Sequence, residues 1–356
     1  MEEVGVGLVG FGLAGQVFHA PLIAATPGLR LRAIATSDPG RRRAAASRFP
    51  DSRLAADLRE LLGSASDLQL LVLASPNRYH LPQALAALEA GLHLVVDKPM
   101  ALSSQEAAQM IAAAHRRGLR LAVFQNRRWD DDFLLLRQVV DSGRLGRIQR
   151  LESRFERWRP ELSPGAWREA EAPDAGGGLL LDLGTHLIDQ ALILGGAPEL
   201  VYAEVRNRRG AAGDDDGFVS LTFPAGLQAH LWVSAVAAVA GPRLLALGTR
   251  GGLATSGLDP QEAQLRSGVS PLDPGFGRRS GREQWALWGG AGGDQQLAFP
   301  PGRYRDFYSG MWHALVDGTE VPVPGEDGLR TLEVVEAARE SARRREVVRL
   351  SPSPHP

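Results

Sequence analysis

The first third of the chain alternates short apolar runs with longer stretches of helical periodicity. Short apolar runs bounded by turn residues are typical of buried parallel strands, and apolar positions three or four residues apart predict helices. Because strands and helices alternate, the pattern indicates an α/β fold with a doubly wound parallel sheet, whose ligands lie beyond the carboxyl ends of the strands. Strands are predicted at residues 4–9, 29–36, 68–74, 92–96 and 119–124, and helices at 41–49, 80–90 and 103–117.

Beyond residue 124 the pattern changes to largely consecutive strands separated by turn signals. Such an order predicts a second α/β domain with an open, largely antiparallel sheet. Its strands are expected at 147–158, 199–207, 218–223, 227–234 and 243–248, with later helices at 304–317 and 325–345. The glycine- and proline-rich residues 267–302 are expected to be irregular. The predicted domains are residues 1–124 and 125–350, followed by a disordered tail at 351–356.

One stretch of the second half, GGGLLLDLGTHLIDQ at residues 176–190, is apolar on most faces of a helix. Its polar side chains Asp182, His186, Asp189 and Gln190 fall on one stripe, because residues three and four apart share a helical face. A helix of this kind is buried, so the stripe must face polar partners or a cavity. Two interpretations remain open at this point, a structural Asp/His hydrogen bond in the core and the polar wall of an active site.

Composition narrows the function classes without choosing one. With 356 residues, a net charge of −1 and no cysteine, the chain is an ordinary globular protein with no disulfide or thiolate chemistry. The near-neutral balance predicts no affinity for nucleic acid or anionic membranes. No apolar run is long enough to span a bilayer, and the N-terminus has no leader pattern, so we expect a cytoplasmic protein.

The first predicted strand is followed at once by Gly10-Phe11-Gly12-Leu13-Ala14-Gly15 and then by a helical stretch. This is G-x-G-x-x-G in the strand–turn–helix setting that dinucleotide binding requires. The first two glycines allow a tight turn and the close approach of a pyrophosphate, and the third allows helix–strand packing. We therefore predict a dinucleotide site that includes Gly10, Phe11, Gly12, Leu13 and Gly15. The alternative is a tight turn without a ligand.

The end of the second predicted strand bears on the choice between NADP and NAD. An acidic residue there usually binds the ribose 2′-hydroxyl of NAD, whereas a 2′-phosphate needs nearby arginine. Thr36 and Ser37 occupy this position and Arg41 follows, so NADP(H) is favoured. NAD(H) stays possible, because Asp38 reaches the ribose if the strand ends later than predicted.

Several polar residues lie at the carboxyl ends of later strands, which is the ligand edge of such a sheet. Lys98 is the only lysine among the 40 lysine and arginine residues of the chain. This suggests a role that arginine cannot fill, because the lysine ammonium is compact whereas the arginine guanidinium is large and planar. His80, which opens a helix beside this edge, is either a capping or packing residue or a cofactor contact. The residues predicted at this edge are Ser75, Pro76, Asn77, His80, Asp97 and Lys98.

Three motifs in this order, GFGLAG, DKP and GGGLLLDLGTHLIDQ, resemble the Gfo/Idh/MocA family of NAD(P)-dependent oxidoreductases. The likeness spans nearly the whole chain, and it implies a Rossmann domain followed by an open-faced α/β sheet domain. Asp97 stands where the family's Glu-Lys-Pro motif usually has a glutamate, so the side chain is one methylene shorter. HAPL at 19–22 and QNRRWDDDF at 125–133 further resemble the subgroup that contains NADPH-dependent scyllo-inositol dehydrogenases.

The resemblance also implies roles for individual residues. Lys98, Asp182 and His186 match the family's catalytic lysine and its Asp-x-x-x-His pair, with the histidine as acid/base for the substrate hydroxyl. Asn126 is similar to residues at the nicotinamide end of the cofactor. The expected substrate contacts are Arg127, Trp167 and Arg168.

These observations predict an NADP(H)-dependent enzyme that interconverts a secondary alcohol and a ketone on a sugar or cyclitol. Histidine has the pKa best suited to take the hydroxyl proton near neutral pH, and a lysine ammonium stabilises developing alkoxide charge. The alternatives are an NAD-dependent enzyme of the same family and a non-catalytic nucleotide-sensing regulator. No metal site is predicted. An exposed sheet face predicts a homodimer or homotetramer.

Overall fold

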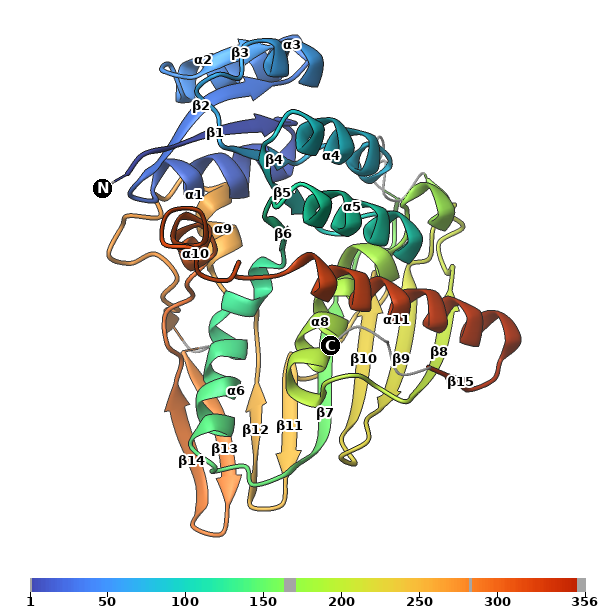
Figure 1. Ribbon diagram of the computed structural model, residues 1–356. Helices are drawn as coiled ribbons and strands as arrows, with labels where there is room; N and C mark the ends of the chain where they lie inside the picture. Colours follow the sequence, from blue (N-terminus) through green and yellow to red (C-terminus); the bar gives the residue numbers. More distant parts are fainter. Residues whose placement is uncertain (1, 163–170, 282–283, 351–356) are drawn as a thin grey trace. The chain divides into compact units, whose positions relative to one another are not determined.

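The structure is a computed structural model that describes residues 2–162, 171–281 and 284–350 (Figure 1). The chain forms two compact units, and both are discontinuous in sequence. The first contains Met1–Asn126, Pro260–Gly277 and Arg303–Leu329. The second contains Arg127–Asp259, Arg278–Gly302 and the residues from Arg330 onward. Two segments from the C-terminal third therefore pack with the N-terminal residues.

Six strands build the sheet of the first unit, in the order β3-β2-β1-β4-β5-β6, and all neighbouring pairs are parallel. The order reverses between β1 and β4, which makes the carboxyl end of β1 the switch point where doubly wound sheets bind ligands. The predicted doubly wound sheet is confirmed. The strands are β1 Val4–Val9, β2 Leu29–Ala35, β3 Arg53–Ala55, β4 Leu70–Leu73, β5 His93–Asp97 and β6 Leu121–Phe124.

The helices of the first unit begin where short polar side chains cap them. Asp38, Asp57 and Ser103 each accept a hydrogen bond from the backbone N–H three residues later, which satisfies a group that the helix leaves open. The helical segments are η1 Ala14–His19, α1 Ala20–Ala24, α2 Pro39–Arg48, α3 Leu58–Gly63, η2 Asn77–Tyr79, α4 His80–Glu89 and α5 Ser104–Arg116.

Two helices from the C-terminal third complete this unit, α9 (Gln261–Arg266) and α10 (Arg305–Val316). α9 packs on η1, and α10 packs on α1. The buried side chain of Gln261 accepts a hydrogen bond of 2.7 Å from the backbone of Tyr304, so the two segments are tied to each other. Trp312 donates from its indole to the backbone oxygen of Glu2, 2.9 Å away.

The second unit contains a nine-stranded sheet in the order β14-β13-β12-β11-β7-β10-β9-β8-β15. Only β7 and β10 run parallel, which confirms the predicted, largely antiparallel sheet. The strands are β7 Ile148–Glu156, β8 Leu200–Arg206, β9 Asp216–Thr222, β10 Gln228–Ser234, β11 Leu244–Gly248, β12 Gly251–Thr255, β13 Trp285–Gly290, β14 Gly293–Ala298 and β15 Val348–Arg349.

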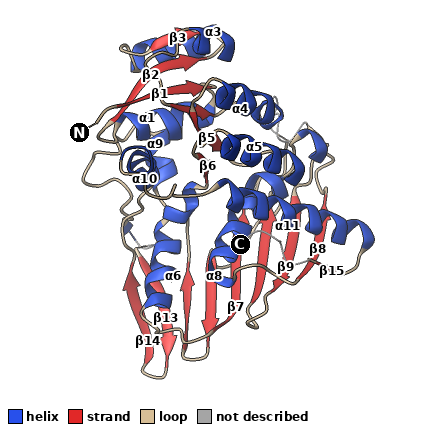
Figure 2. Ribbon diagram, viewed as in Figure 1, coloured by secondary structure: helices blue, strands red, loops and turns tan. Residues whose placement is uncertain are grey.

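Burial alternates along the central strands, so the two faces of this sheet differ. Leu151, Phe155 and Leu231 point to the face that the helices cover and are buried, whereas Phe218 and Trp232 point to the other face and are half-buried. Figure 2 shows α6 and α8 in front of this sheet. The remaining helical segments are η3 Asn126–Trp129, α6 Asp131–Asp141, η4 Pro173–Ala175, η5 Leu180–Gly184, α8 Thr185–Gly195 and α11 Gly325–Arg344.

The prediction that residues 267–302 are irregular is wrong for the second part of that range. β13 and β14 form an antiparallel hairpin there, joined at the glycine-rich residues 290–293. Trp285 and Leu287 are exposed while Ala286 and Trp288 are buried, which is strand alternation. The abundance of glycine and proline hid this signal, because β14 is a largely exposed edge strand with few apolar residues. The predicted disordered tail at 351–356 lies outside the described residues.

Candidate active site

The glycine-rich turn follows β1, and its three glycines meet different constraints. Gly10 has a φ of +95°, which disfavours any residue with a side chain. A Cβ on Gly15 would lie 2.1 Å from the backbone oxygen of Gly10, so the helix approaches the strand too closely for a side chain. A Cβ on Gly12 would instead meet only the guanidinium of Arg41 within 4 Å, the nearer atom at 3.7 Å. The turn thus leaves open space at Gly12, where a pyrophosphate would approach in such a fold.

The two apolar residues within the turn have separate surroundings. Phe11 is fully buried and packs edge-on against Phe49, with ring centroids 6.1 Å apart. Leu13 is 50% exposed and stands at the start of the π-helix η1, which no side chain caps. Phe11 therefore anchors the turn. A helix start that no side chain caps leaves backbone N–H groups open, which favours an anion, so the residues present fit a dinucleotide.

The residues after β2 place an arginine next to this turn. Thr36 is buried, Ser37 is exposed, and the carboxylate of Asp38 accepts a hydrogen bond of 2.7 Å from the backbone of Arg41. Asp38 therefore serves as the N-cap of α2. The guanidinium of Arg41 lies beside Gly12. The group nearest to the glycine turn at this strand end is thus a cation.

His80 connects the turns that follow β4 and β5. Its Nε2 lies 2.9 Å from the backbone oxygen of Ser75, and its Nδ1 lies 3.1 Å from that of Pro99. His80 is fully buried, and burial lowers its pKa. Ser75 donates to Gln83 at 2.6 Å, and Asn77 is buried beside them. These contacts hold the ring between the two turns, and the cofactor contact expected of His80 stays a prediction.

Lys98 follows β5 directly and is half-buried, with a cis peptide bond to Pro99. The backbone N–H of Lys98 donates to the carboxylate of Asp97 at 2.9 Å. Burial alone would raise the pKa of Asp97, but the neighbouring His19, Lys98 and His80 lower it overall. The buried carboxylate of Asp97 thus stays charged next to the backbone of Lys98.

The predicted helix over residues 176–190 has a different form in the structure. After the glycines it begins as the π-helix η5 and continues as α8, so the predicted uniform α-helical spacing is wrong at Asp182. Gly178 has a φ of +93°, and a Cβ there would lie 2.1 Å from the carboxylate of Asp214. The same carboxylate accepts a hydrogen bond of 2.7 Å from the backbone of Leu180. Asp214 therefore caps the helix from another loop, a contact that the sequence pattern did not show.

The polar stripe divides into two halves. Asp189 receives two hydrogen bonds from the guanidinium of Arg128, at 2.8 and 2.6 Å, and Gln190 donates to the backbone of Arg127 at 2.8 Å. These two residues belong to a buried structural network. His186 is 4% exposed and packs edge-on against Phe155, with centroids 6.3 Å apart, and Asp182 is half-buried on the π-turn. π-turns inside helices are frequent at functional sites.

Three consecutive aspartates at 130–132 explain the polar character of the QNRRWDDDF segment. Each carboxylate lies in an ion pair with an arginine of the second unit, and all three are buried. Buried charges of this kind are tolerated because they are paired. The pairs are Asp130 with Arg127 at 3.2 Å, Asp131 with Arg279 at 2.8 Å and Asp132 with Arg243 at 3.4 Å.

The remaining predicted residues differ in what the structure says of them. Arg127 is buried and stacks over Phe155, with its guanidinium carbon 4.7 Å from the ring centroid. Asn126 is buried at the start of η3. Trp167 and Arg168 lie outside the described residues.

Sequence reasoning assigned no role to His19 itself and missed Tyr308 entirely, although both are fully buried near Asp97. Tyr308 is 211 positions from Asp97 along the chain, so no local pattern joins them.

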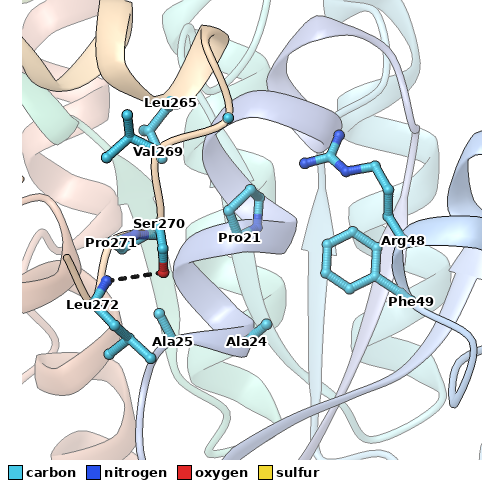
Figure 3. Close-up of a pocket in the computed structure, with 11 residues that line it drawn as sticks. Pro21, Ala24, Ala25, Arg48, Phe49, Leu265, Val269, Ser270, Pro271 and Leu272 are labelled. Carbon is cyan, nitrogen blue, oxygen red and sulfur yellow. Dashed lines mark hydrogen bonds between the residues drawn. The ribbon is translucent and has the colours of Figure 1, made fainter.

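A pocket in the first unit, drawn in Figure 3, contains none of the predicted site residues. It is lined mainly by apolar side chains of α1 and the segment after α9. Among the residues described, no cluster of three or more His, Asp or Glu side chains suits a metal ion. None of the helices in the described ranges is both long and apolar enough for a membrane span.

Comparison with known proteins supports the resemblance seen in the motifs. The profile described as "Oxidoreductase family, NAD-binding Rossmann fold" matches residues 4–125, and that of the "GFO/IDH/MocA C-terminal domain" matches residues 133–254. The chain is 36% identical to the uncharacterized oxidoreductase YdgJ of Escherichia coli, over 98% of this chain and 99% of that protein. It is 32% identical to scyllo-inositol 2-dehydrogenase (NADP(+)) IolW of Bacillus subtilis, over 98% and 97%. The crystal structure of an oxidoreductase from Bacillus cereus, 28% identical, matches with a TM-score of 0.88 and covers 98% of this chain and 99% of that one.

Proposed function

The chain belongs to the Gfo/Idh/MocA family of NAD(P)-dependent oxidoreductases, and from that premise we propose an NADP(H)-dependent dehydrogenase that interconverts a secondary alcohol and a ketone on a sugar or cyclitol. The observation that carries the proposal is the whole-length similarity to an NADP-dependent scyllo-inositol 2-dehydrogenase. The glycine turn and the residues after β5 and on η5–α8 supply suitable groups. No observation favours the nucleotide-sensing regulator.

Each candidate residue has a role that its chemistry suits. Oxidation of a carbinol removes a hydride from carbon and a proton from oxygen, and a nicotinamide cofactor would supply the hydride acceptor. We assign the proton to the imidazole of His186, which returns it to the oxygen when the reaction runs towards the alcohol. Asp182 holds the hydroxyl or orients the imidazole. The ammonium of Lys98 stabilises the negative charge that develops on the oxygen.

The other assignments stay predictions. Substrate contacts are expected at Arg127, Trp167 and Arg168, and cofactor contacts at Asn77 and Asn126. For Arg127 the proposal is limited by its buried ion pair with Asp130, which leaves it little freedom to follow a ligand. A cytoplasmic location and the absence of nucleic-acid or membrane partners are likewise expectations.

A panel of inositols and pyranoses tests the reaction directly. Each polyol is assayed with NADP⁺ and NAD⁺, and each corresponding ketone with NADPH and NADH, by nicotinamide absorbance. We expect turnover of at least one cyclitol or sugar, and faster turnover with the phosphorylated cofactor. A chain that binds NADPH but turns over no member of the panel would contradict the dehydrogenase proposal and favour a regulator.

Replacing Arg41 with alanine tests the cofactor preference. Arg41 lies beside Gly12, and a charge-assisted contact to a 2′-phosphate contributes about 1.5–3 kcal/mol. We therefore expect the Kd of NADPH to rise about tenfold or more, while that of NADH changes little. Isothermal titration with both cofactors measures the two values. Arg43→Ala is the matched control, because it removes an exposed guanidinium from the same helix. Tighter binding of NADH than of NADPH by the unaltered chain would overturn the preference.

We also expect a homodimer or homotetramer. The face of the nine-stranded sheet opposite the helices carries half-buried Phe218 and Trp232 in register with each other, and exposed Trp285 and Leu287 towards the edge. Aromatic groups in such numbers on one open sheet favour coverage by a second copy. A monomeric mass by light scattering at micromolar concentration would contradict this expectation.

A further inference from the structure

Three buried side chains lie in a row behind Lys98 within the first unit. Nδ1 of His19, at the end of η1, lies 2.6 Å from the hydroxyl of Tyr308 on α10. Nε2 of the same ring lies 3.8 Å from Oδ1 of Asp97. That oxygen accepts the hydrogen bond from the backbone of Lys98 at 2.9 Å. The row thus leads from a phenol through an imidazole and a carboxylate to the lysine.

The hydrogen-bonding capacity of the His19 imidazole determines which group donates at each step of this row. A neutral imidazole carries one N–H, and the hydrogen bond made by one nitrogen determines which nitrogen bears it. If Nδ1 donated to Tyr308, the bare lone pair of Nε2 would face a carboxylate. If Tyr308 donates to Nδ1, the proton sits on Nε2 and points towards Asp97. Burial raises the pKa of Tyr308 well above its usual value, so the phenol stays protonated and able to donate.

The gap between His19 and Asp97 is consistent with this direction. Among the described residues, Nε2 of His19 has no partner within hydrogen-bond distance, and the nearest oxygen of the Asp97 carboxylate lies 3.8 Å from it. The titratable groups around that carboxylate are the ammonium of Lys98 and the two imidazoles of His19 and His80. An N–H directed at a buried carboxylate is stabilising even at this distance, because the surroundings screen charge poorly.

Aromatic packing holds the imidazole in place. Phe124 lies 4.4 Å from the His19 ring and 5.9 Å from that of Tyr308, measured between centroids. Phe307 packs edge-on against Phe124 at 4.9 Å. His19 and Tyr308 are both fully buried, so neither ring can turn without displacing its neighbours. Groups locked in this way are able to hold a charged partner in one geometry.

We propose that Tyr308 and His19 are positioning residues for Lys98: they orient the Asp97 carboxylate, and Asp97 in turn holds the backbone and the ammonium of the lysine. The proposal rests on the catalytic role proposed for Lys98. Neither residue is assigned a contact with substrate or cofactor. Tyr308 would thus serve the N-terminal unit from a helix near the far end of the chain.

Kinetics of Tyr308→Phe test the proposal first. A small displacement of the ammonium is expected to lower kcat about tenfold, while the KM for the cofactor changes less than threefold. Tyr304→Phe is the matched control, since it removes a hydroxyl from an equally buried tyrosine whose ring packs on Phe18 instead of His19. For His19, which lies between Tyr308 and Asp97, the variant His19→Gln keeps an N–H donor and should retain more activity than His19→Leu. An unchanged kcat in Tyr308→Phe, or an equal loss in Tyr304→Phe, would overturn the proposal.

A second readout does not depend on turnover. Because Lys98 is the only lysine, reductive methylation with ¹³C-formaldehyde labels just this side chain and the α-amine. We expect the ¹³C resonance of Lys98 to move in Tyr308→Phe and His19→Leu and to keep its position in Tyr304→Phe. A resonance that stays in place in all three variants would overturn the positioning role. If the chain turns over no substrate, the proposed function fails, and the resonance alone still decides whether Tyr308 and His19 position the lysine.

Discussion

Replacing His186 with alanine is expected to lower kcat about a thousandfold and to leave the Kd of NADPH within threefold of its original value. The reason is that a positioned acid/base contributes about 10²–10⁴-fold to proton transfer, and no water molecule replaces it with equal effect. His186 is buried on α8 against Phe155, where its orientation is restricted. Steady-state rates with the substrate identified in the panel give kcat, and titration of NADPH gives the Kd.

Two further measurements separate proton transfer from packing at His186. His186→Asn keeps a polar group of similar reach but cannot titrate near neutral pH, so it should be nearly as slow as the alanine variant. Added imidazole should restore part of the activity of His186→Ala and none of the activity of a variant that is merely misfolded. Rates close to normal in both variants would remove His186 from the mechanism and with it the proton-transfer scheme.

Replacing Lys98 with arginine is expected to lower kcat about a hundredfold although the positive charge is kept. Loss of one donor to a developing oxyanion typically costs about 10²–10³-fold, and a planar guanidinium cannot occupy the place of a compact ammonium. The chain uses arginine for every other basic residue, so this position is the exception. Lys98→Ala should be slower still, because it also removes the charge. Both rates are measured with saturating NADP⁺ and substrate.

Binding measurements distinguish the possible outcomes at Lys98. If Lys98→Arg turns over normally and Lys98→Ala does not, only the charge matters, and the argument from the single lysine is wrong. If both variants keep normal kcat, Lys98 has no catalytic role. A loss of NADPH binding in parallel with the loss of rate would assign the lysine to the cofactor rather than to the substrate oxygen.

Much of the first unit could be predicted from local sequence patterns. β1 was predicted with the observed bounds, and helices α2 and α5 have typical N-cap residues, Asp38 and Ser103, directly before them in the sequence. Strand β3 and the hairpin β13–β14 were missed, and for β3 and β14 the reason is their position at the edge of a sheet. Edge strands bury few side chains, so their apolar periodicity is weak.

The candidate site was only partly accessible in this way. The stripe on residues 176–190 correctly marked a buried polar surface, but its pattern could not show that Asp189 pairs with Arg128. Nor did it show the π-turn at Asp182, where Gly178 and the carboxylate of Asp214 meet at the helix start. Each of these features depends on a partner from another segment.

The sequence by itself determined the α/β class, the glycine turn and the residue types available for hydride-transfer chemistry, because these follow from interactions within a few positions. Only the tertiary structure decided that segments 260–277 and 303–329 join the N-terminal unit and that Tyr308 reaches His19. The physical reason is that apolar burial selects for hydrophobic character rather than for a particular neighbour. Which buried polar groups meet is settled by packing between segments more than 200 residues apart in the chain, such as η1 and α10.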